Sequence, residues 1–146
     1  PHPPPFAFLT VIFRTPMNQH SPTDLLEAAG EVRKKAHSKY SKFSVGSALL
    51  TVDGSIFLGC NVENASYGLT LCAERVALTS AITAGHRTFR AIAIAADNLA
   101  APCGACRQVL TEFCGEEFPV YIASADDLAS FETHLLGKLL PERFEL

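Results

Sequence analysis

The chain has 146 residues, which is enough for one compact domain and too few for two of ordinary size. Hydrophobic residues make up 48% of it, enough for a core without disulfides, and no apolar run reaches the ~20 residues of a membrane-spanning helix. The formal net charge is −3 and the basic residues are scattered, so a membrane or nucleic-acid partner is disfavoured and a small-molecule ligand is favoured.

The first residues differ in composition from the rest. A proline-rich start and a short apolar run, 6–13, precede Met17, the only methionine. The run has neither the basic flank nor the small-residue cleavage site of a secretory signal. We expect residues 1–16 to be an N-terminal extension with no part in the chemistry, and residues 17–146 to form a single domain. The alternative is that 1–16 forms a short strand or apolar arm packed on the domain or on another subunit.

The first half of the domain predicts a helix and a hairpin. Ser21 is a suitable N-cap with proline directly after it, and apolar residues then recur at helical spacing, which predicts a helix over 22–37. Two β-rich runs, 44–52 and 55–62, flank Asp53-Gly54, a pair typical of a tight hairpin turn.

The second half predicts helices alternating with short buried strands. A polar loop over 61–70 leads into it. Helices are predicted over 71–84 (ended by Gly85), 104–114 (ended by Gly115) and 125–136, strands over 90–96 and 118–123, and a tail over 139–146. Such alternation within one domain is typical of an α/β layered sheet.

Three cysteines and one glutamate lie at the starts of two predicted helices. Cys72-Ala73-Glu74 begins one helix, and Cys103 and Cys106, three residues apart on one helical face, begin the next. At a helix N-terminus the dipole favours thiolate, the form that binds metal. Sulfur ligands at this spacing select zinc or an iron–sulfur cluster, and three protein ligands leave a fourth position open.

Glu74 adds a proton-transfer group to this metal site. An open zinc site binds water and lowers its pKa towards neutrality. Glu74 follows Cys72 by two residues, so it can take the water's proton without ligating the metal and pass it to a substrate nitrogen and to the leaving amine. This arrangement is similar to that of zinc-dependent deaminases.

Arg75 is a candidate partner of the metal ligands. Three thiolates and Zn²⁺ sum to a charge of −1, which weakens the metal as a Lewis acid. Arg75 comes three residues after Cys72, so it can donate hydrogen bonds to the ligand sulfur and offset that charge. The alternative is a solvated surface arginine.

Five segments in a fixed order extend the pattern along residues 21–146. They are 43–46 (Phe-Ser-Val-Gly), 61–67 (Asn-Val-Glu-Asn-Ala-Ser-Tyr), 72–75 (Cys-Ala-Glu-Arg), 102–108 (Pro-Cys-Gly-Ala-Cys-Arg-Gln) and the tail 139–144. Together they resemble the small homotetrameric cytidine deaminase family. The resemblance implies a three-layer α/β/α fold around a central mixed sheet of about five strands.

The resemblance also implies an activity and a cofactor. One Zn²⁺ per chain would be held by Cys72, Cys103 and Cys106, and an activated water would attack C4 of cytidine or deoxycytidine while Glu74 moves the protons. The products would be uridine or deoxyuridine and ammonia, a reaction of pyrimidine salvage.

Substrate contacts follow from the same resemblance. Asn61 and Glu63 would hold the ribose hydroxyls, Phe43 would stack near the nucleoside, and the Ala73 backbone with Glu74 would read the pyrimidine edge. The alternatives are two polar residues in an exposed loop and, for Phe43, ordinary core packing.

Other contacts would cross between subunits of a homotetramer. Ala65 and Tyr67 would reach the pocket of an adjacent subunit, and Phe144 would stack on the base from another chain. The alternatives are a surface loop residue for Tyr67 and a hydrophobic plug for Phe144.

Three rival functions remain open at this point. The first is a deaminase for a nucleoside-like antibiotic or for cytosine in nucleic acid, which the Asn61 and Glu63 loop disfavours. The second is a structural zinc module, which needs a fourth protein ligand such as Cys60, Cys114 or a histidine. The third is a thiol–disulfide oxidoreductase built on Cys103 and Cys106, which has no use for the Cys72 segment.

The remaining cysteines bear on the compartment. Cys60 and Cys114 match no ligand position, and we expect both to be small buried residues. An odd number of cysteines, five, without a secretory signal favours a reducing compartment, the cytoplasm.

Overall fold

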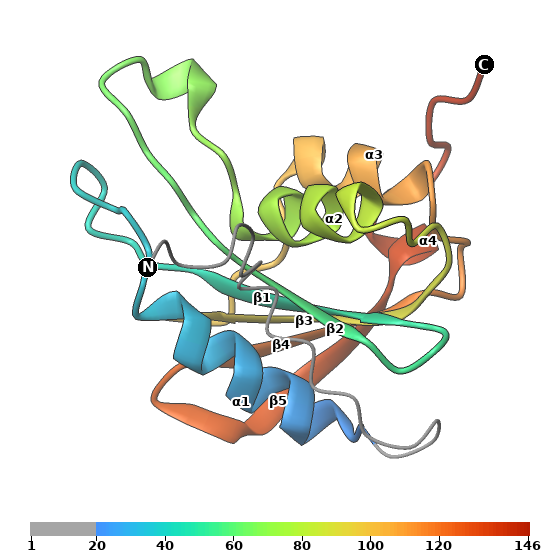
Figure 1. Ribbon diagram of the computed structural model, residues 1–146, viewed down its shortest axis with the longest axis horizontal. Helices are drawn as coiled ribbons and strands as arrows, with labels where there is room; N and C mark the ends of the chain where they lie inside the picture. Colours follow the sequence, from blue (N-terminus) through green and yellow to red (C-terminus); the bar gives the residue numbers. More distant parts are fainter. Residues whose placement is uncertain (1–19) are drawn as a thin grey trace, which may run out of the picture.

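The computed structural model describes residues 20–146, so the prediction for residues 1–16 lies outside the described part (Figure 1). In chain order the elements are α1 (Pro22–Arg33), β1 (Gly46–Thr51), β2 (Ile56–Cys60), a 3-10 turn (Tyr67–Leu69), α2 (Ala73–Thr83), β3 (Phe89–Ala96), α3 (Gly104–Thr111), β4 (Pro119–Ser124), β5 (Asp127–Leu135) and α4 (Leu136–Leu139). Within residues 20–146, none of the helices has the length and apolar character that crossing a membrane requires.

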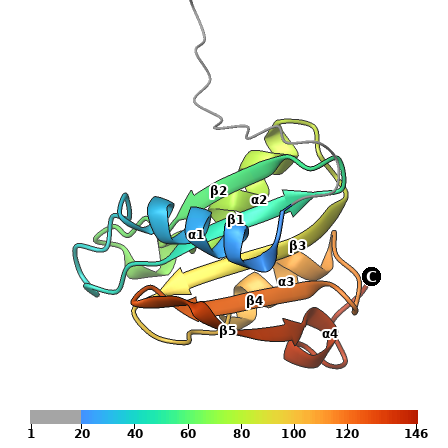
Figure 2. The same ribbon diagram turned by 90° about the horizontal axis from the view of Figure 1, so that it is seen from below.

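The five strands form one mixed sheet in the order β2-β1-β3-β4-β5. Only β3 and β4 pair in parallel, and the other neighbours are antiparallel. The parallel pair requires a crossover, and α3 provides it. Figure 2 shows the strands in this order, with α1 in front of the sheet and α2 and α3 behind it.

The two faces of the sheet carry different side chains because strand residues alternate in direction. In β3 the small residues Ala91, Ala93 and Ala95 pack against α1, whereas Ile92 and Ile94 pack under α2 and α3. Small residues on one face let a single helix lie close, and branched residues fill the wider space under the other helices. The three-layer α/β/α fold with a five-stranded mixed sheet, which the family resemblance implied, is confirmed.

The first helix begins as predicted and ends earlier. Ser21 and Asp24 form a reciprocal capping box at its start. It ends at Arg33 rather than at residue 37, because the N–H groups of the next three residues bond three residues back instead of four. The hairpin turn is as predicted, with Gly54 at φ 88°.

The helices after the hairpin also differ at their ends. Gly85 has φ 97° and follows α2 as the predicted left-handed residue. The third helix ends at Thr111, well before Gly115, which is not among the described glycines with positive φ.

The helix predicted over 125–136 is wrong, because that segment forms the edge strand β5, antiparallel to β4. Its register shifts opposite Ala123 and Ser124, which leaves extra residues unpaired. The shift places Leu128 and Phe131, three residues apart, on the same face of the sheet. That spacing imitates a helix in the sequence, and only the pairing with β4 reveals the strand.

Candidate functional site

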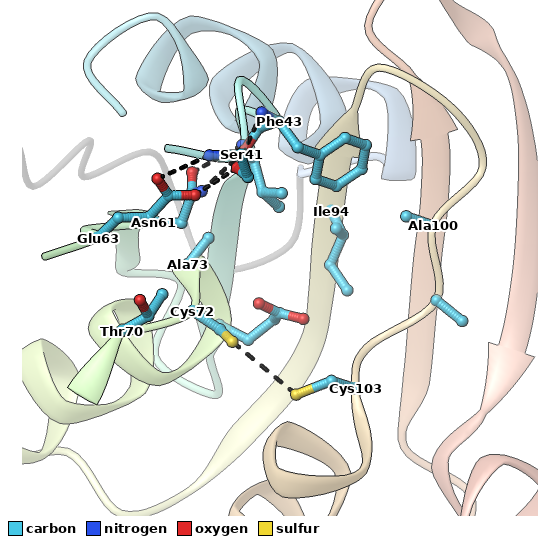
Figure 3. A pocket seen from close by; sticks show the side chains of 13 residues that line it. Ser41, Phe43, Asn61, Glu63, Thr70, Cys72, Ala73, Ile94, Ala100 and Cys103 are labelled. Atoms are coloured by element: carbon cyan, nitrogen blue, oxygen red, sulfur yellow. Dashed lines mark hydrogen bonds between the residues drawn. The ribbon is translucent and has the colours of Figure 1, made fainter. Parts of the chain in front are cut away.

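Three cysteines converge where α2 and α3 begin. Cys72 is the N-cap of α2 and Cys103 the N-cap of α3, while Cys106 lies buried in the first turn of α3. The three sulfurs lie within 4.8 Å of one another, and those of Cys72 and Cys103 are 3.8 Å apart, pointing at each other in Figure 3.

This spacing fits one zinc ion. Tetrahedral bonds of about 2.3 Å place zinc-bound sulfurs roughly 3.8 Å apart, whereas a disulfide requires about 2.05 Å. All three cysteines are free thiols. In residues 20–146 no histidine, aspartate, glutamate or further cysteine joins the group, so no fourth protein ligand closes the site and the structural zinc module loses its support.

The pKa values of Cys72 and Cys106 are shifted in opposite directions. Hydrogen bonds from Cys106 and then Arg75 lower the pKa of Cys72 to about 5, although burial opposes the shift. The pKa of Cys106 is raised by its hydrogen bond to Cys72 and by burial. Of these two sulfurs, Cys72 favours the thiolate and Cys106 favours the thiol, so a cation that binds both must displace a proton.

Arg75 contacts the ligand sulfur. Its Nη2 donates to Cys72 Sγ at 3.4 Å and to the Thr70 carbonyl at 3.0 Å. The guanidinium thus fixes the segment that leads into α2 and places a positive charge beside the sulfur.

Glu74 is buried in the first turn of α2, with 5% of its surface exposed. Burial raises the pKa of its carboxyl to about 7, and the negative charge of Cys72 adds to the shift. Its own backbone N–H, the charge of Arg75 and a hydrogen bond with Cys106 oppose it. A carboxyl with this pKa both accepts and releases a proton near neutral pH.

A cavity of about 240 Å³ opens beside these groups. Its lining brings together most of the residues that the sequence singled out, and adds several that it did not. The lining residues are Ser41, Phe43, Val45, Asn61, Glu63, Thr70, Cys72, Ala73, Glu74, Ile94, Ala100, Ala101 and Cys103. In Figure 3 the polar cluster of Ser41, Asn61 and Glu63 lies at one side, and the sulfurs lie at the other.

Glu63 and Asn61 hold the loop that carries Phe43. Glu63 accepts from the N–H groups of Tyr40 and Ser41 and from the Ser41 hydroxyl, which lowers the pKa of its carboxyl. Asn61 accepts from Val45 N–H and donates to the Phe43 carbonyl, both at 2.9 Å. A carboxylate has about four acceptor positions and a side-chain amide has two N–H groups, so each residue keeps capacity for a ligand.

Three of the predicted substrate-contact residues lie outside this cavity. Ala65 is exposed, Tyr67 is 71% exposed, and Phe144 is 69% exposed on the C-terminal segment. The Tyr67 ring contacts that of Tyr40 at 5.4 Å, and the Phe144 carbonyl accepts from Gln108 Nε2 at 3.1 Å. A single chain therefore does not bring these three residues to the pocket.

Several lining residues were not predicted from the sequence. Ser41 carries no motif of its own, and its position becomes informative only through its bonds to Glu63. Ala100 and Ala101 stand directly before the Pro102-Cys103 motif, so their closeness to the metal ligands was available as a signal. Of the two unmatched cysteines, Cys114 is buried as expected, whereas Cys60 is only half-buried.

Comparison with known proteins agrees with this site. A family model described as "Cytidine and deoxycytidylate deaminase zinc-binding region" matches residues 19–122. The chain is 45% identical over 122 residues to a cytidine deaminase of Sporosarcina psychrophila, covering 82% of this chain and 88% of that protein. It is 45% identical over 133 residues to a probable cytidine deaminase of Dictyostelium discoideum, covering 88% and 86%.

A solved structure shares the fold. The crystal structure of cytidine deaminase from Burkholderia pseudomallei matches with a TM-score of 0.81 and 46% identity, covering 86% of this chain and all of that one (100%).

Proposed function

The chain belongs to the cytidine and deoxycytidylate deaminase family, and on that premise we propose that it hydrolyses cytidine and deoxycytidine to uridine and deoxyuridine with release of ammonia. The observation that carries the proposal is the buried Glu74 carboxyl beside three converging sulfurs, at one side of a cavity that also holds Asn61 and Glu63.

The lining of the cavity favours a neutral substrate. Glu63 and Glu74 both contribute carboxyl groups, and no lysine or arginine is among the lining residues. A phosphate group would meet negative charge without a basic partner. This supports a free nucleoside over a nucleotide or a nucleic acid strand.

Zinc held by Cys72, Cys103 and Cys106 would supply a Lewis acid that lowers the pKa of a water molecule. Glu74 accepts the proton of the attacking water on a carboxylate oxygen. It then delivers that proton to N3 of the pyrimidine, and a second proton follows to the amino group that leaves C4 as ammonia. Atoms balance, because one water is consumed and the C4–N bond is replaced by C4=O.

The other lining residues bind and orient the nucleoside. The spare acceptor position of Glu63 and the spare N–H of Asn61 face the ribose hydroxyls. Phe43 packs against the nucleoside, and the Ala73 backbone with Glu74 reads the pyrimidine edge. Arg75 offsets the excess negative charge of the three thiolates.

The assembly is a homotetramer in this proposal. Ala65, Tyr67 and Phe144 are exposed on the single chain and would complete the pockets of neighbouring subunits. Five free cysteines support a reducing compartment, the cytoplasm. Residues 1–16 form an extension outside the chemistry, and residues 17–146 form the deaminase domain.

An ultraviolet assay of cytidine conversion tests the activity. We expect conversion by the wild type, its loss on removal of zinc by a chelator and its return with added zinc. Glu74→Gln should keep zinc and fold while losing turnover by on the order of a thousandfold. Near-normal turnover in that variant contradicts the role of Glu74. Faster deamination of cytosine in a single-stranded oligonucleotide than of cytidine contradicts the substrate class.

A further inference from the structure

Arg33, the last residue of α1, does not line the pocket, yet it contacts both chain segments that form its sides. Its Nε donates to the Ser44 carbonyl at 2.9 Å, and its Nη2 forms an ion pair with Asp97. The side chain is 22% exposed. One guanidinium thus connects two loops that are distant in sequence.

The first loop carries Phe43. Ser44 lies between Phe43 and Val45, and both of these line the pocket. Asn61 fixes the carbonyl of Phe43 and the N–H of Val45, and Arg33 fixes the carbonyl between them. Removing Arg33 leaves that middle carbonyl without the charged donor that now holds it.

The second loop carries the opposite side of the pocket. Asp97 directly follows β3, and the segment 97–103 then supplies Ala100, Ala101 and the ligand Cys103. Asp97 is held at its carbonyl by the Ser124 hydroxyl at 3.3 Å and at its carboxylate by Arg33. Figure 3 shows Phe43 and Ala100 on separate segments that face the same space.

The position of Arg33 is fixed by the close contact of α1 with β1. A Cβ atom on Gly46 would lie 1.9 Å from the Ala29 carbonyl oxygen and 2.8 Å from Arg33 Cβ. The last turn of α1 therefore rests directly on the strand that follows the Phe43 loop. Arg33 therefore projects from a turn that is in direct contact with the sheet.

We propose that Arg33 is a positioning residue that sets the distance between the Phe43 side and the Ala100 side of the pocket, and with it the fit of the nucleoside. The inference rests on the proposed function. The planar guanidinium donates from different edges to two acceptors at once, which a lysine ammonium at the same place does with poorer geometry.

Steady-state kinetics with cytidine test this role. Arg33→Met keeps an unbranched stem for packing and removes both contacts. We expect KM to rise about tenfold, because hydrogen bonds to charged groups are lost on both sides, while kcat stays within about threefold and zinc stays at one per chain. Arg33→Lys should recover part of the KM change. Lys34→Met is the matched control, because Lys34 directly follows α1 and, within residues 20–146, pairs only with Glu31 of that helix, and this variant should leave KM unchanged.

Hydrogen exchange without substrate gives a second measurement. In Arg33→Met we expect faster exchange in 43–45 and 97–103, with α2 unchanged. Unchanged KM and unchanged exchange would overturn the proposal, and so would a fall in kcat and stability at constant KM. If the wild type does not convert cytidine, the proposed function fails, and the exchange result alone then decides whether Arg33 holds the two loops.

Discussion

At the scale of single residues, the metal site is governed by the protonation of Cys72 and Cys106. Cys72 has its pKa lowered to about 5 and Cys106 has its pKa raised, because the first accepts hydrogen bonds that the second and Arg75 donate. The pair therefore holds one proton at neutral pH, and zinc must displace it.

Removal of a ligand tests the link between metal and fold. We expect Cys72→Ala to lose stoichiometric zinc and to lower the free energy of unfolding by at least about 3 kcal/mol, or on the order of 10 °C in Tm, because metal binding contributes to folding. Metal analysis and thermal unfolding measure both effects. Cys114→Ala is the control, since Cys114 is buried in the core and burial raises its pKa to about 12. Full zinc content in Cys72→Ala would contradict the ligand set.

Zinc affinity should depend on pH in a defined direction. Because Cys106 keeps a proton that zinc displaces, binding should tighten as pH rises, by about tenfold per pH unit for each displaced proton. Below pH 5 Cys72 also becomes protonated, and the dependence should steepen there. A competition titration with a chelating dye between about pH 4 and about pH 8 measures both parts of this dependence. A zinc affinity that does not change with pH would contradict the displacement of a proton from Cys106.

At the scale of elements, α2 matters most, because it carries both Cys72 and Glu74. Its height above the sheet depends on Gly59 in β2. A Cβ atom at Gly59 would lie 2.2 Å from the Ala73 carbonyl oxygen and 2.5 Å from Ala77 N. The first turns of α2 thus touch the strand backbone directly.

Gly59→Ala should therefore push the start of α2 away from the sheet. We expect a loss of about 2–3 kcal/mol of stability from overpacking, together with weaker zinc binding. Denaturant unfolding and metal analysis measure the two effects. Gly68→Ala is the control, because a Cβ there meets nothing within 4 Å. Equal behaviour of the two variants would show that the contact is not limiting.

At the scale of the whole molecule, the pocket and the loops next to it lie at one end of the sheet. In Figure 1 the loops 37–44 and 61–70 project together from that end, and Tyr40 meets Tyr67 between them. Large apolar side chains stay exposed on the second loop and its flanks. They are Val62, Tyr67, Leu69 and Leu71. Such a patch suits contact with another copy of the chain.

For the homotetramer that the family resemblance implies, sedimentation should give a mass four times the 15.7 kDa of one chain. We expect Tyr67→Ala to raise KM for cytidine with little change in zinc content, because Tyr67 would act in a neighbouring pocket and not in its own. A fully active monomer would contradict both the tetramer and the shared pocket.

Local patterns in the sequence predicted the group formed by Cys72, Cys103 and Cys106, the position of Glu74 beside it, the hairpin and the α/β class. These depend on local signals: spacing within one helical turn, a helix start, or a two-residue turn, each complete within a few residues. The α/β/α layering and the five-stranded sheet came from the family resemblance, and the structure agrees.

The remaining features depended on contacts between segments that are distant in the chain. Whether 125–136 is a helix or a strand depended on pairing with β4. Leu128 and Phe131 are three residues apart, a spacing typical of a helix, and the register shift in the strand is what places both on one face of the sheet. The role of Ser41 depends on its hydrogen bond to Glu63. The role of Arg33 depends on its contacts with Ser44 and Asp97, which lie in two other segments of the chain. The physical reason is that a hydrogen bond or ion pair between distant segments forms only after the fold has brought them together, and one sequence carries no local trace of it.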